Sequence, residues 1–109
     1  MLNITLYHAN WCGHCVDFMP EWNKFTTKIN QLGGEYNGVK INIKDSEESR
    51  MKRGEATLNG KEIEGFPTLK FGLVVGGEKK EYEYLKEKDS DKMIEYVKKV
   101  CVGIKKYKK

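Results

Sequence analysis

The pattern of apolar and polar positions in the first part of the chain predicts a strand, a helix and a second strand. Residues 2–8 have the short β-rich composition of a strand. Apolar side chains then recur at helical spacing through residues 13–32, and glycines follow as a stop. Pro20 should kink this helix, because it removes a backbone donor and clashes with the preceding turn. Residues 39–44 alternate apolar and polar, which predicts a strand with one wet face near a sheet edge.

The middle of the chain predicts a short helix, a loop and a hairpin. Residues 46–53 favour a short helix, with Met51 as its main apolar contact, and residues 54–64 have the composition of a polar loop. Residues 68–75 and 78–85 are rich in β-forming side chains, and the two glycines between them predict a tight turn. These two segments should therefore form a β-hairpin.

The end of the chain predicts one further helix. Asp89 or Ser90 can cap it. Its apolar residues fall on one side: Met93, Ile94, Val97, Cys101 and Ile104. The predicted order is β-α-β-α-β-β-α, which indicates an α/β fold with a mixed, four-stranded sheet flanked by helices.

Length and composition indicate one soluble globular domain, residues 1–109, which we expect to be monomeric. The length of 109 residues is typical of one domain. An apolar content of 39% and an aromatic content of 11% exclude a disordered chain. No apolar run reaches the ~18 residues that a membrane span needs, so no membrane association is expected.

The net charge of +4 is confined to the end of the chain. The basic tail, residues 105–109, carries four lysines, and +4 minus +4 leaves residues 1–104 neutral. The simplest interpretation is a solvated chain terminus, although such a basic tail could also bind an anionic surface. Lysine and glutamate alternate through the rest of the chain, so no basic face is indicated and nucleic acid is not an expected partner.

The cysteines carry the clearest chemical signal. Three cysteines cannot form a fully paired disulfide framework, and two of them lie in Cys12-Gly13-His14-Cys15. Residues 1–6 have neither the basic start nor the apolar stretch of a secretory signal, so a cytoplasmic location is expected. In a reducing compartment a surface CxxC is catalytic or metal-binding more often than structural.

A CxxC motif between a strand and a helix has a physical rationale for redox chemistry. Cys12 would lie at the helix N-terminus, where free amides and the helix dipole stabilise a thiolate. Cys15 follows three residues later on the same face, close enough for a disulfide. Cys12 would attack and the more buried Cys15 would resolve the mixed disulfide. His14 can carry a positive charge near neutral pH and favour the thiolate further.

A metal site is the alternative for this motif. Zinc normally needs four ligands, and one CxxC supplies two. Cys101 with His8 or His14 could complete the set on paper, but Cys101 is predicted on the core face of the last helix. No metal is therefore expected, and Cys101 is either a small core hydrophobe or a redox-regulatory thiol.

The sequence Trp11-Cys12-Gly13-His14-Cys15, followed by Phe18, Pro20, Glu21 and Trp22, resembles the active-site segment of thioredoxin-fold domains. Its Cys-Gly-His-Cys form is typical of protein disulfide isomerases. Gly65-Phe66-Pro67-Thr68 matches the second signature of that family. There the proline is cis and faces the cysteines, and the residue before it bonds the substrate backbone.

The resemblance implies a minimal thioredoxin fold and a thiol–disulfide oxidoreductase that reduces, forms or isomerises protein disulfides. It implies no cofactor beyond the cysteine pair, protein substrates, and a recycling partner. The alternative is a peptide-binding or chaperone-like module with little turnover. The implied catalytic residues are Cys12, Cys15 and His14, and the implied substrate-binding residues are Trp11, Gly13, Phe66 and Pro67.

This chain departs from the family pattern in three respects. The strand before the CxxC begins at about residue 3, so we expect a domain pared down to the minimal core, without the family's usual N-terminal strand and helix. Leu6 stands where the family often buries an acid that takes the proton of the resolving cysteine. The remaining proton acceptors are His14, His8 or a water molecule, of which we favour the water. Residues 58–62 lengthen the loop before Pro67.

Overall fold

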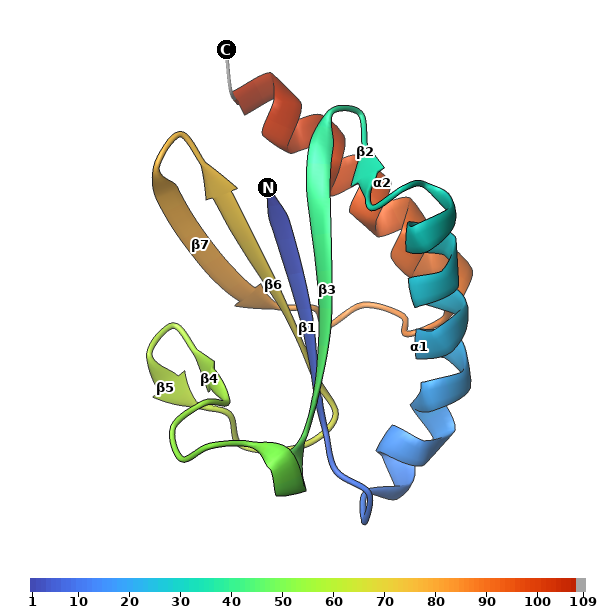
Figure 1. Cartoon of the computed structure of the whole chain (residues 1–109), viewed down its shortest axis with the longest axis vertical. Coiled ribbons are helices and arrows are strands. Elements are labelled where there is room, and N and C mark those ends of the chain that lie inside the picture. The colour runs from blue at the N-terminus through green and yellow to red at the C-terminus, as the bar shows by residue number, and fades with distance from the viewer. Residues whose placement is uncertain (108–109) are drawn as a thin grey trace.

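The computed structural model describes residues 1–107 and contains a five-stranded mixed sheet with two helices beside it (Figure 1). The strands lie in the order β2-β3-β1-β6-β7. β1 pairs in parallel with β3 and antiparallel with β6. The strand bounds are β1 (Leu2–His8), β2 (Glu35–Tyr36), β3 (Val39–Glu47), β6 (Thr68–Val75) and β7 (Glu78–Glu83).

Helices α1 (Gly13–Gln31) and α2 (Ser90–Tyr107) lie on the same side of the sheet and contact each other (Figure 1). α1 continues through Pro20 without interruption. Glu21 of α1 accepts a hydrogen bond from the backbone N–H of Ser90 at 3.0 Å, which joins α1 to the start of α2. Lys28 of α1 forms an ion pair with Asp91 of α2. The sheet and both helices bury one common core; its largest fully buried side chains include Trp22, Phe25, Phe71, Tyr84, Met93 and Val97.

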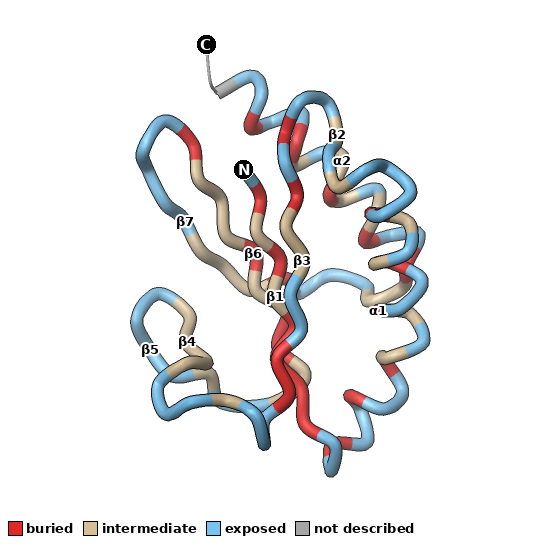
Figure 2. The backbone as a smooth tube through the Cα atoms, viewed as in Figure 1, coloured by how far each residue is buried: buried red, intermediate tan, exposed pale blue. Residues whose placement is uncertain are grey.

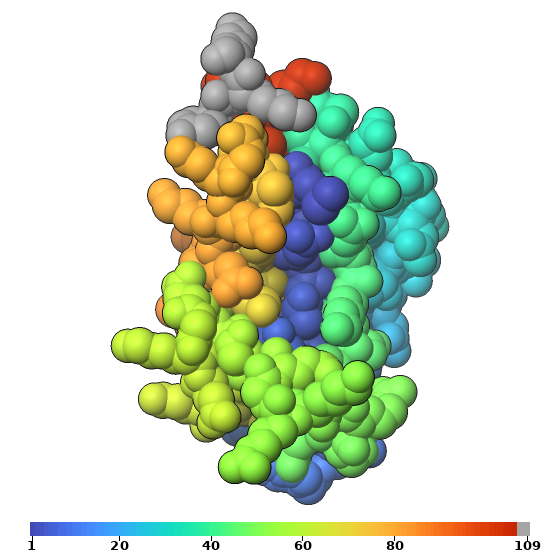
Figure 3. Space-filling model, turned by 60° about the vertical axis from the view of Figure 1, so that its left-hand side comes forward, coloured from blue at the N-terminus to red at the C-terminus, as the bar shows by residue number. Residues whose placement is uncertain are grey.

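Within residues 1–107, no helix covers the other face of the sheet. Along β1, Leu2, Ile4 and Leu6 are fully buried toward the helices, whereas Asn3 and Thr5 on the other face are partly exposed. β1 is visible at the surface between β3 and β6 in Figure 3, and Figure 2 shows buried and less buried positions alternating along it. This face is polar, which makes its contact with water acceptable.

The short helix predicted at residues 46–53 is wrong. β3 continues to Glu47, which pairs with His8 of β1, and only a 3₁₀ turn, η1 (Glu48–Arg50), follows. The Glu47 carboxylate accepts hydrogen bonds from the backbone and hydroxyl of Ser49, which closes this tight turn. Met51 is the main apolar residue of the segment and gives too little apolar surface to hold a longer helix.

Two Asn-Gly turns add strands that the sequence analysis did not predict. Residues 54–64 are not simply a loop, because β4 (Thr57–Leu58) and β5 (Lys61–Glu62) form a small hairpin around residues 59–60. Residues 37–38 turn β2 back onto β3. In both turns the asparagine has φ 53° and the glycine a positive φ, as two-residue hairpin turns require. β2 gives the main sheet five strands rather than the predicted four, and β4 and β5 form a separate two-stranded sheet.

The predicted β6–β7 hairpin and the last helix are confirmed. Phe71 of β6 stacks on Tyr84 at 5.5 Å between ring centroids and meets Tyr96 of α2 edge-on at 5.3 Å. Asp89 caps α2 by accepting a hydrogen bond from the N–H of Asp91 at 2.9 Å. Residues 108–109 of the predicted basic tail lie outside the described residues. Neither helix, over residues 1–107, has the length and apolar character needed to cross a membrane.

Candidate active site

The Cys12–Cys15 motif begins in the turn between β1 and α1 and continues into the first turn of α1. β1 ends at His8, and the N–H of Cys12 donates to the carbonyl of Ala9 at 3.1 Å, which closes a tight turn. Cys12 is the N-cap of α1, with an extended backbone (φ −88°, ψ 112°). Its carbonyl accepts the first helical hydrogen bond, from Val16 at 3.1 Å. The Cys12 side chain therefore occupies the position at which a helix leaves free N–H donors.

The two cysteines are free thiols that share one small buried cluster. The Sγ of Cys12 accepts a hydrogen bond from the backbone N–H of Cys15 at 3.2 Å, and the Cys12 thiol donates to the carbonyl of Phe66 at 3.4 Å. Cys12 is 6% exposed and Cys15 is 2% exposed. Cys15 is thus the more buried, as predicted, but the difference is small. Ala9 and Phe66 complete this cluster, which is separate from the main core.

Burial raises the pKa of the Cys15 thiol to about 11, and its hydrogen bond with Cys12 adds to the shift. A hydrogen bond with the backbone of Ala9 opposes these effects but is smaller. A thiol in an apolar pocket resists ionisation because its thiolate is poorly solvated there. Cys15 is therefore protonated at neutral pH, and any reaction in which it acts as a nucleophile must first remove its proton.

Trp11, Phe66 and Pro67 lie around the Cys12–Cys15 motif, and for Pro67 this is the placement that the resemblance implies. The Phe66–Pro67 peptide bond is cis. The Phe66 ring meets the Trp11 ring edge-on, with 5.9 Å between centroids. Trp11 is 72% exposed, yet its indole N–H donates to the carboxylate of Glu48 at 2.6 Å. This bond fixes a large aromatic surface beside Cys12 while leaving it open to a partner.

Sequence reasoning missed the acidic residues that hold this loop. Asn10 donates to Glu47 at 3.2 Å, and Trp11 is bound by Glu48, so both loop residues are tied to the end of β3. Glu47 is buried, and its bonds with Ser49 lower the pKa of its carboxyl group. Adjacent parallel strands end at the same edge of a sheet. Pairing residues 2–8 in parallel with residues 39–47 would have been the signal.

Gly13 and His14 lie on the exposed first turn of α1. No neighbour comes within 4 Å of the position that a Cβ would take on Gly13, so the approach to Cys12 from that side is open. His14 and Pro67 line an open hollow of about 400 Å³ beside the cysteine pair. Asp17 and Lys88 also line this hollow, and neither of them was predicted as a site residue.

Leu6, which stands in place of the family's acid, and His8, one of the predicted proton acceptors, are both buried. Leu6 is fully buried between Asp45 of β3 and Leu69 of β6. His8 is buried at the end of β1, with its Nε2 3.9 Å from a carboxylate oxygen of Asp45. Within residues 1–107, this Nε2 is the buried side-chain nitrogen without a hydrogen-bond partner. This nitrogen belongs to the residue before Ala9, whose backbone is hydrogen-bonded with the Cys15 thiol.

Cys101 does not join the other two cysteines. It is fully buried in the main core on α2, as predicted, and burial raises the pKa of its thiol. Among the described residues, no group of three or more histidine, cysteine or acidic side chains is arranged to hold a metal ion. The arrangement of Cys12 and Cys15 is that of a vicinal dithiol.

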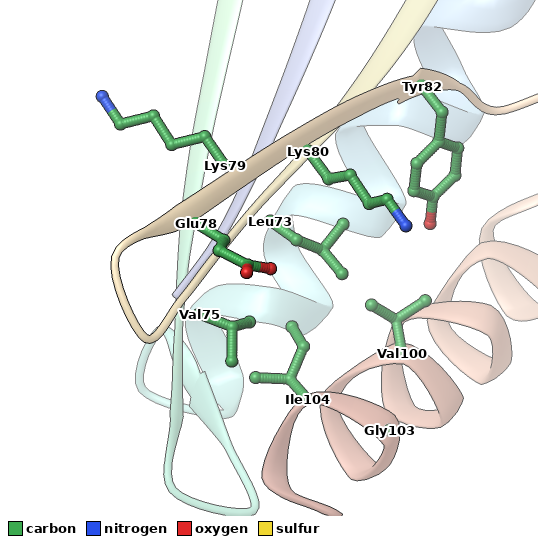
Figure 4. Close-up of a pocket in the computed structure, with 9 residues that line it drawn as sticks. All are labelled: Leu73, Val75, Glu78, Lys79, Lys80, Tyr82, Val100, Gly103 and Ile104. Atoms are coloured by element: carbon green, nitrogen blue, oxygen red, sulfur yellow. The ribbon is translucent and has the colours of Figure 1, made fainter. Parts of the chain in front are cut away.

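A second hollow, of about 600 Å³, lies at the far end of the molecule between the β6–β7 hairpin and α2 (Figure 4). Its walls are mainly apolar, from Leu73, Val75, Val100 and Ile104. Among the described residues, no cysteine or histidine lines it. It therefore offers none of the chemistry found at the Cys12–Cys15 motif.

Comparisons with known proteins identify the family of the chain. The thioredoxin family profile matches residues 2–99. Protein disulfide-isomerase of Hordeum vulgare is 31% identical over 94 residues, and that of Gallus gallus is 27% identical over 93 residues. Each match covers 85% of this chain but only 17% and 16% of the relative, so the chain spans about a sixth of the length of these proteins.

Solved structures show the same fold at low sequence identity. ERdj5 (crystal form I) superimposes with a TM-score of 0.71 and 13% identity, covering 95% of this chain and 13% of that one. The first thioredoxin domain of mouse protein disulfide-isomerase A4 gives a TM-score of 0.59 and 18% identity, covering 92% of this chain and 63% of that one. Because the family profile matches nearly the whole chain, this protein belongs to the thioredoxin family.

Proposed function

We propose that this protein is a thiol–disulfide oxidoreductase that acts on protein disulfides through Cys12 and Cys15. The observation that carries the proposal is the Cys12 sulfur itself. It lies at the N-cap of α1, accepts a hydrogen bond from the Cys15 N–H and faces the Phe66 carbonyl. Hydrogen bonds from helix N-terminal amides stabilise a thiolate, which is the attacking form of the group.

The proposed reaction has two exchange steps. The Cys12 thiolate attacks one sulfur of a substrate disulfide, forms a mixed disulfide and releases the other substrate sulfur as a thiolate. Cys15 then loses its proton and attacks the Cys12 sulfur, which releases the second substrate thiol. Two electrons pass to the substrate, and the protein is left with a Cys12–Cys15 disulfide. The reverse sequence oxidises a dithiol substrate, so the same pair can reduce, form or isomerise disulfides.

The surroundings of Cys12 suit an extended polypeptide substrate. Trp11 offers an exposed aromatic surface, Gly13 leaves one side open, and the Phe66 backbone lies next to the reacting sulfur. Backbone groups at such a position can pair with a substrate strand. Relatives named protein disulfide-isomerase support this substrate class, and we propose Trp11, Gly13, Phe66 and Pro67 as the substrate-binding residues.

Reduction of insulin by dithiothreitol tests the proposal directly. We expect the wild-type protein to accelerate the reaction and Cys12→Ser to lose the acceleration, because serine cannot form the mixed disulfide. Cys101→Ala is the matched control, since it removes a buried thiol away from the site. Activity that survives in Cys12→Ser would refute the proposal. Peptide binding without any acceleration by the wild type would favour a chaperone-like module instead.

His14 is proposed to tune the redox couple rather than to transfer electrons. Its positive charge near the exposed start of α1 would favour the Cys12 thiolate and so stabilise the reduced protein. His14→Pro should therefore shift the reduction potential in the negative direction, by tens of millivolts, where each 30 mV is about 1.4 kcal/mol. Equilibration with glutathione buffers measures the shift. An unchanged potential would remove His14 from the account.

A further inference from the structure

The hollow lined by His14 and Pro67 lies next to the reacting cysteine, and two free charges of opposite sign face it. Its walls come from α1, from the loop that holds Pro67 and from the segment before α2. His14 and Pro67 line the side of the hollow nearest Cys12. The residue before Pro67 is Phe66, and its carbonyl oxygen lies 3.4 Å from the Cys12 sulfur. A substituent on the sulfur that exchanges with Cys12 can therefore extend into this hollow.

The charges that face the hollow are those of Asp17, Glu21, Lys88 and, when it is protonated, His14. The carboxylate oxygens of Glu21 are already occupied, by the N–H of Ser90 at 3.0 Å and by Lys24 at 3.2 Å. Among the described residues, Asp17 and Lys88 form no hydrogen bond or ion pair, either with each other or with a third residue. One free carboxylate, from α1, and one free ammonium group, from the segment before α2, thus line the same hollow.

We propose that this hollow is a charge-selective subsite for the thiol partner of Cys12. Asp17 binds an ammonium or guanidinium group of the partner, and Lys88 binds a carboxylate. Partners that carry both charges close to the reacting sulfur, as a peptide with basic and acidic residues beside its cysteine does, exchange faster than neutral partners. This inference rests on the proposed exchange activity of Cys12.

The selectivity arises in the first exchange step. Reduced protein and a disulfide RSSR form Cys12–S–S–R and release RS⁻, and the R group that stays bound lies beside the hollow. Cys15 then displaces the second RS⁻, so one RSSR becomes two thiols while the protein dithiol becomes a disulfide. Exposed ion pairs contribute modestly, which corresponds to about two- to five-fold in rate for each charge.

Four small disulfides that differ in charge distinguish the contribution of Asp17 from that of Lys88. Reduced protein is mixed with cystamine (cationic), dithiodipropionate (anionic), cystine (zwitterionic) or hydroxyethyl disulfide (neutral), and its oxidation is followed by stopped flow. Each rate constant is divided by that for hydroxyethyl disulfide. The intrinsic reactivity of each disulfide cancels when the ratio for a variant is compared with the ratio for the wild type.

We expect Asp17→Asn to lower the cystamine ratio about two- to five-fold, Lys88→Gln to lower the dithiodipropionate ratio similarly, and either variant to lower the cystine ratio. Added salt should shrink these differences. Glu35→Gln and Lys79→Gln are the matched controls, because they change the net charge equally at exposed positions on the far end of the sheet.

Two negative results are distinguishable. Ratios in Asp17→Asn and Lys88→Gln that shift no more than in the controls, or that shift equally for cationic and anionic disulfides, would overturn the subsite. A wild-type protein that does not react even with hydroxyethyl disulfide would overturn the exchange activity itself, and the subsite with it.

Discussion

Cys15→Ala should accumulate a stable mixed disulfide between Cys12 and its substrate. In the wild type, the Cys15 thiol is hydrogen-bonded with the Cys12 thiol, so the resolving group is already beside the bond that it must break. Removing it leaves only external thiols to release the substrate. Such intramolecular reactions have effective concentrations far above those of thiols in solution, so we expect the lifetime of the complex to rise by orders of magnitude.

Intact mass spectrometry after acid quenching measures this effect with a peptide disulfide as substrate. Cys12→Ser/Cys15→Ala is the control for trapping at Cys101, and it should give no adduct. An adduct that resolves as quickly in Cys15→Ala as in the wild type would contradict the assignment of Cys15 as the resolving thiol.

Leu6→Asp should accelerate the second exchange step near neutral pH while destabilising the fold. The Cys15 pKa of about 11 means that little thiolate is present at pH 7, and its fraction rises tenfold per pH unit. We therefore expect release of a mixed disulfide by the wild type to speed up with pH. A carboxylate at position 6 could take the proton of Cys15 and flatten this dependence between pH 6 and 8.

The cost in stability follows from burial. Leu6 is fully buried in the central strand, so an ionised aspartate there would lack a partner, at about 3–5 kcal/mol of unfolding free energy. Burial would raise the pKa of this aspartate above its unfolded value of about 3.9. The folded state would then bind the proton more tightly, so the loss of stability should be smallest at low pH, where the carboxyl group is neutral, and should grow as pH rises.

Leu6→Asn separates the two effects, because it is polar and similar in size but cannot accept the proton. It should lower stability without accelerating release. Stopped-flow release rates and denaturant unfolding of the three proteins provide the comparison. Equal release rates for wild type and Leu6→Asp across pH 6 to 8 would mean that another group, such as His8 or a water molecule, already removes the proton.

The sequence predicted the parts of the fold that rest on regular periodicity. The spacing of Phe18, Trp22, Phe25 and Ile29 gave α1, and the glycine pair before residue 78 gave the β6–β7 hairpin. Residues 35–38 and 57–62 were missed because two-residue strands have no periodicity. Their Asn-Gly turns were the available signal.

The residues of the candidate site also divide into those that the sequence predicted and those that it did not. The cysteine pair and the residues around Pro67 are marked by short motifs, so their proximity was predictable. Asp17 lies on α1 just after Cys15, but no motif marks it as functional. Glu47, Glu48 and Lys88 are far from the motif in the sequence, and strand pairing and packing bring them to the site. The predicted helix at residues 46–53 also hid Glu47, because it assigned to a helix a residue that ends β3.

The central claim is that Cys12 and Cys15 form a reversible redox couple, and a redox titration tests it most directly. The protein is equilibrated in glutathione buffers, quenched with acid, alkylated and analysed by peptide mapping. We expect a single two-electron transition in which Cys12 and Cys15 form the disulfide while Cys101 stays free, with a midpoint nearer about −180 mV than about −270 mV. A disulfide that involves Cys101, or no disulfide across that range, would contradict the account.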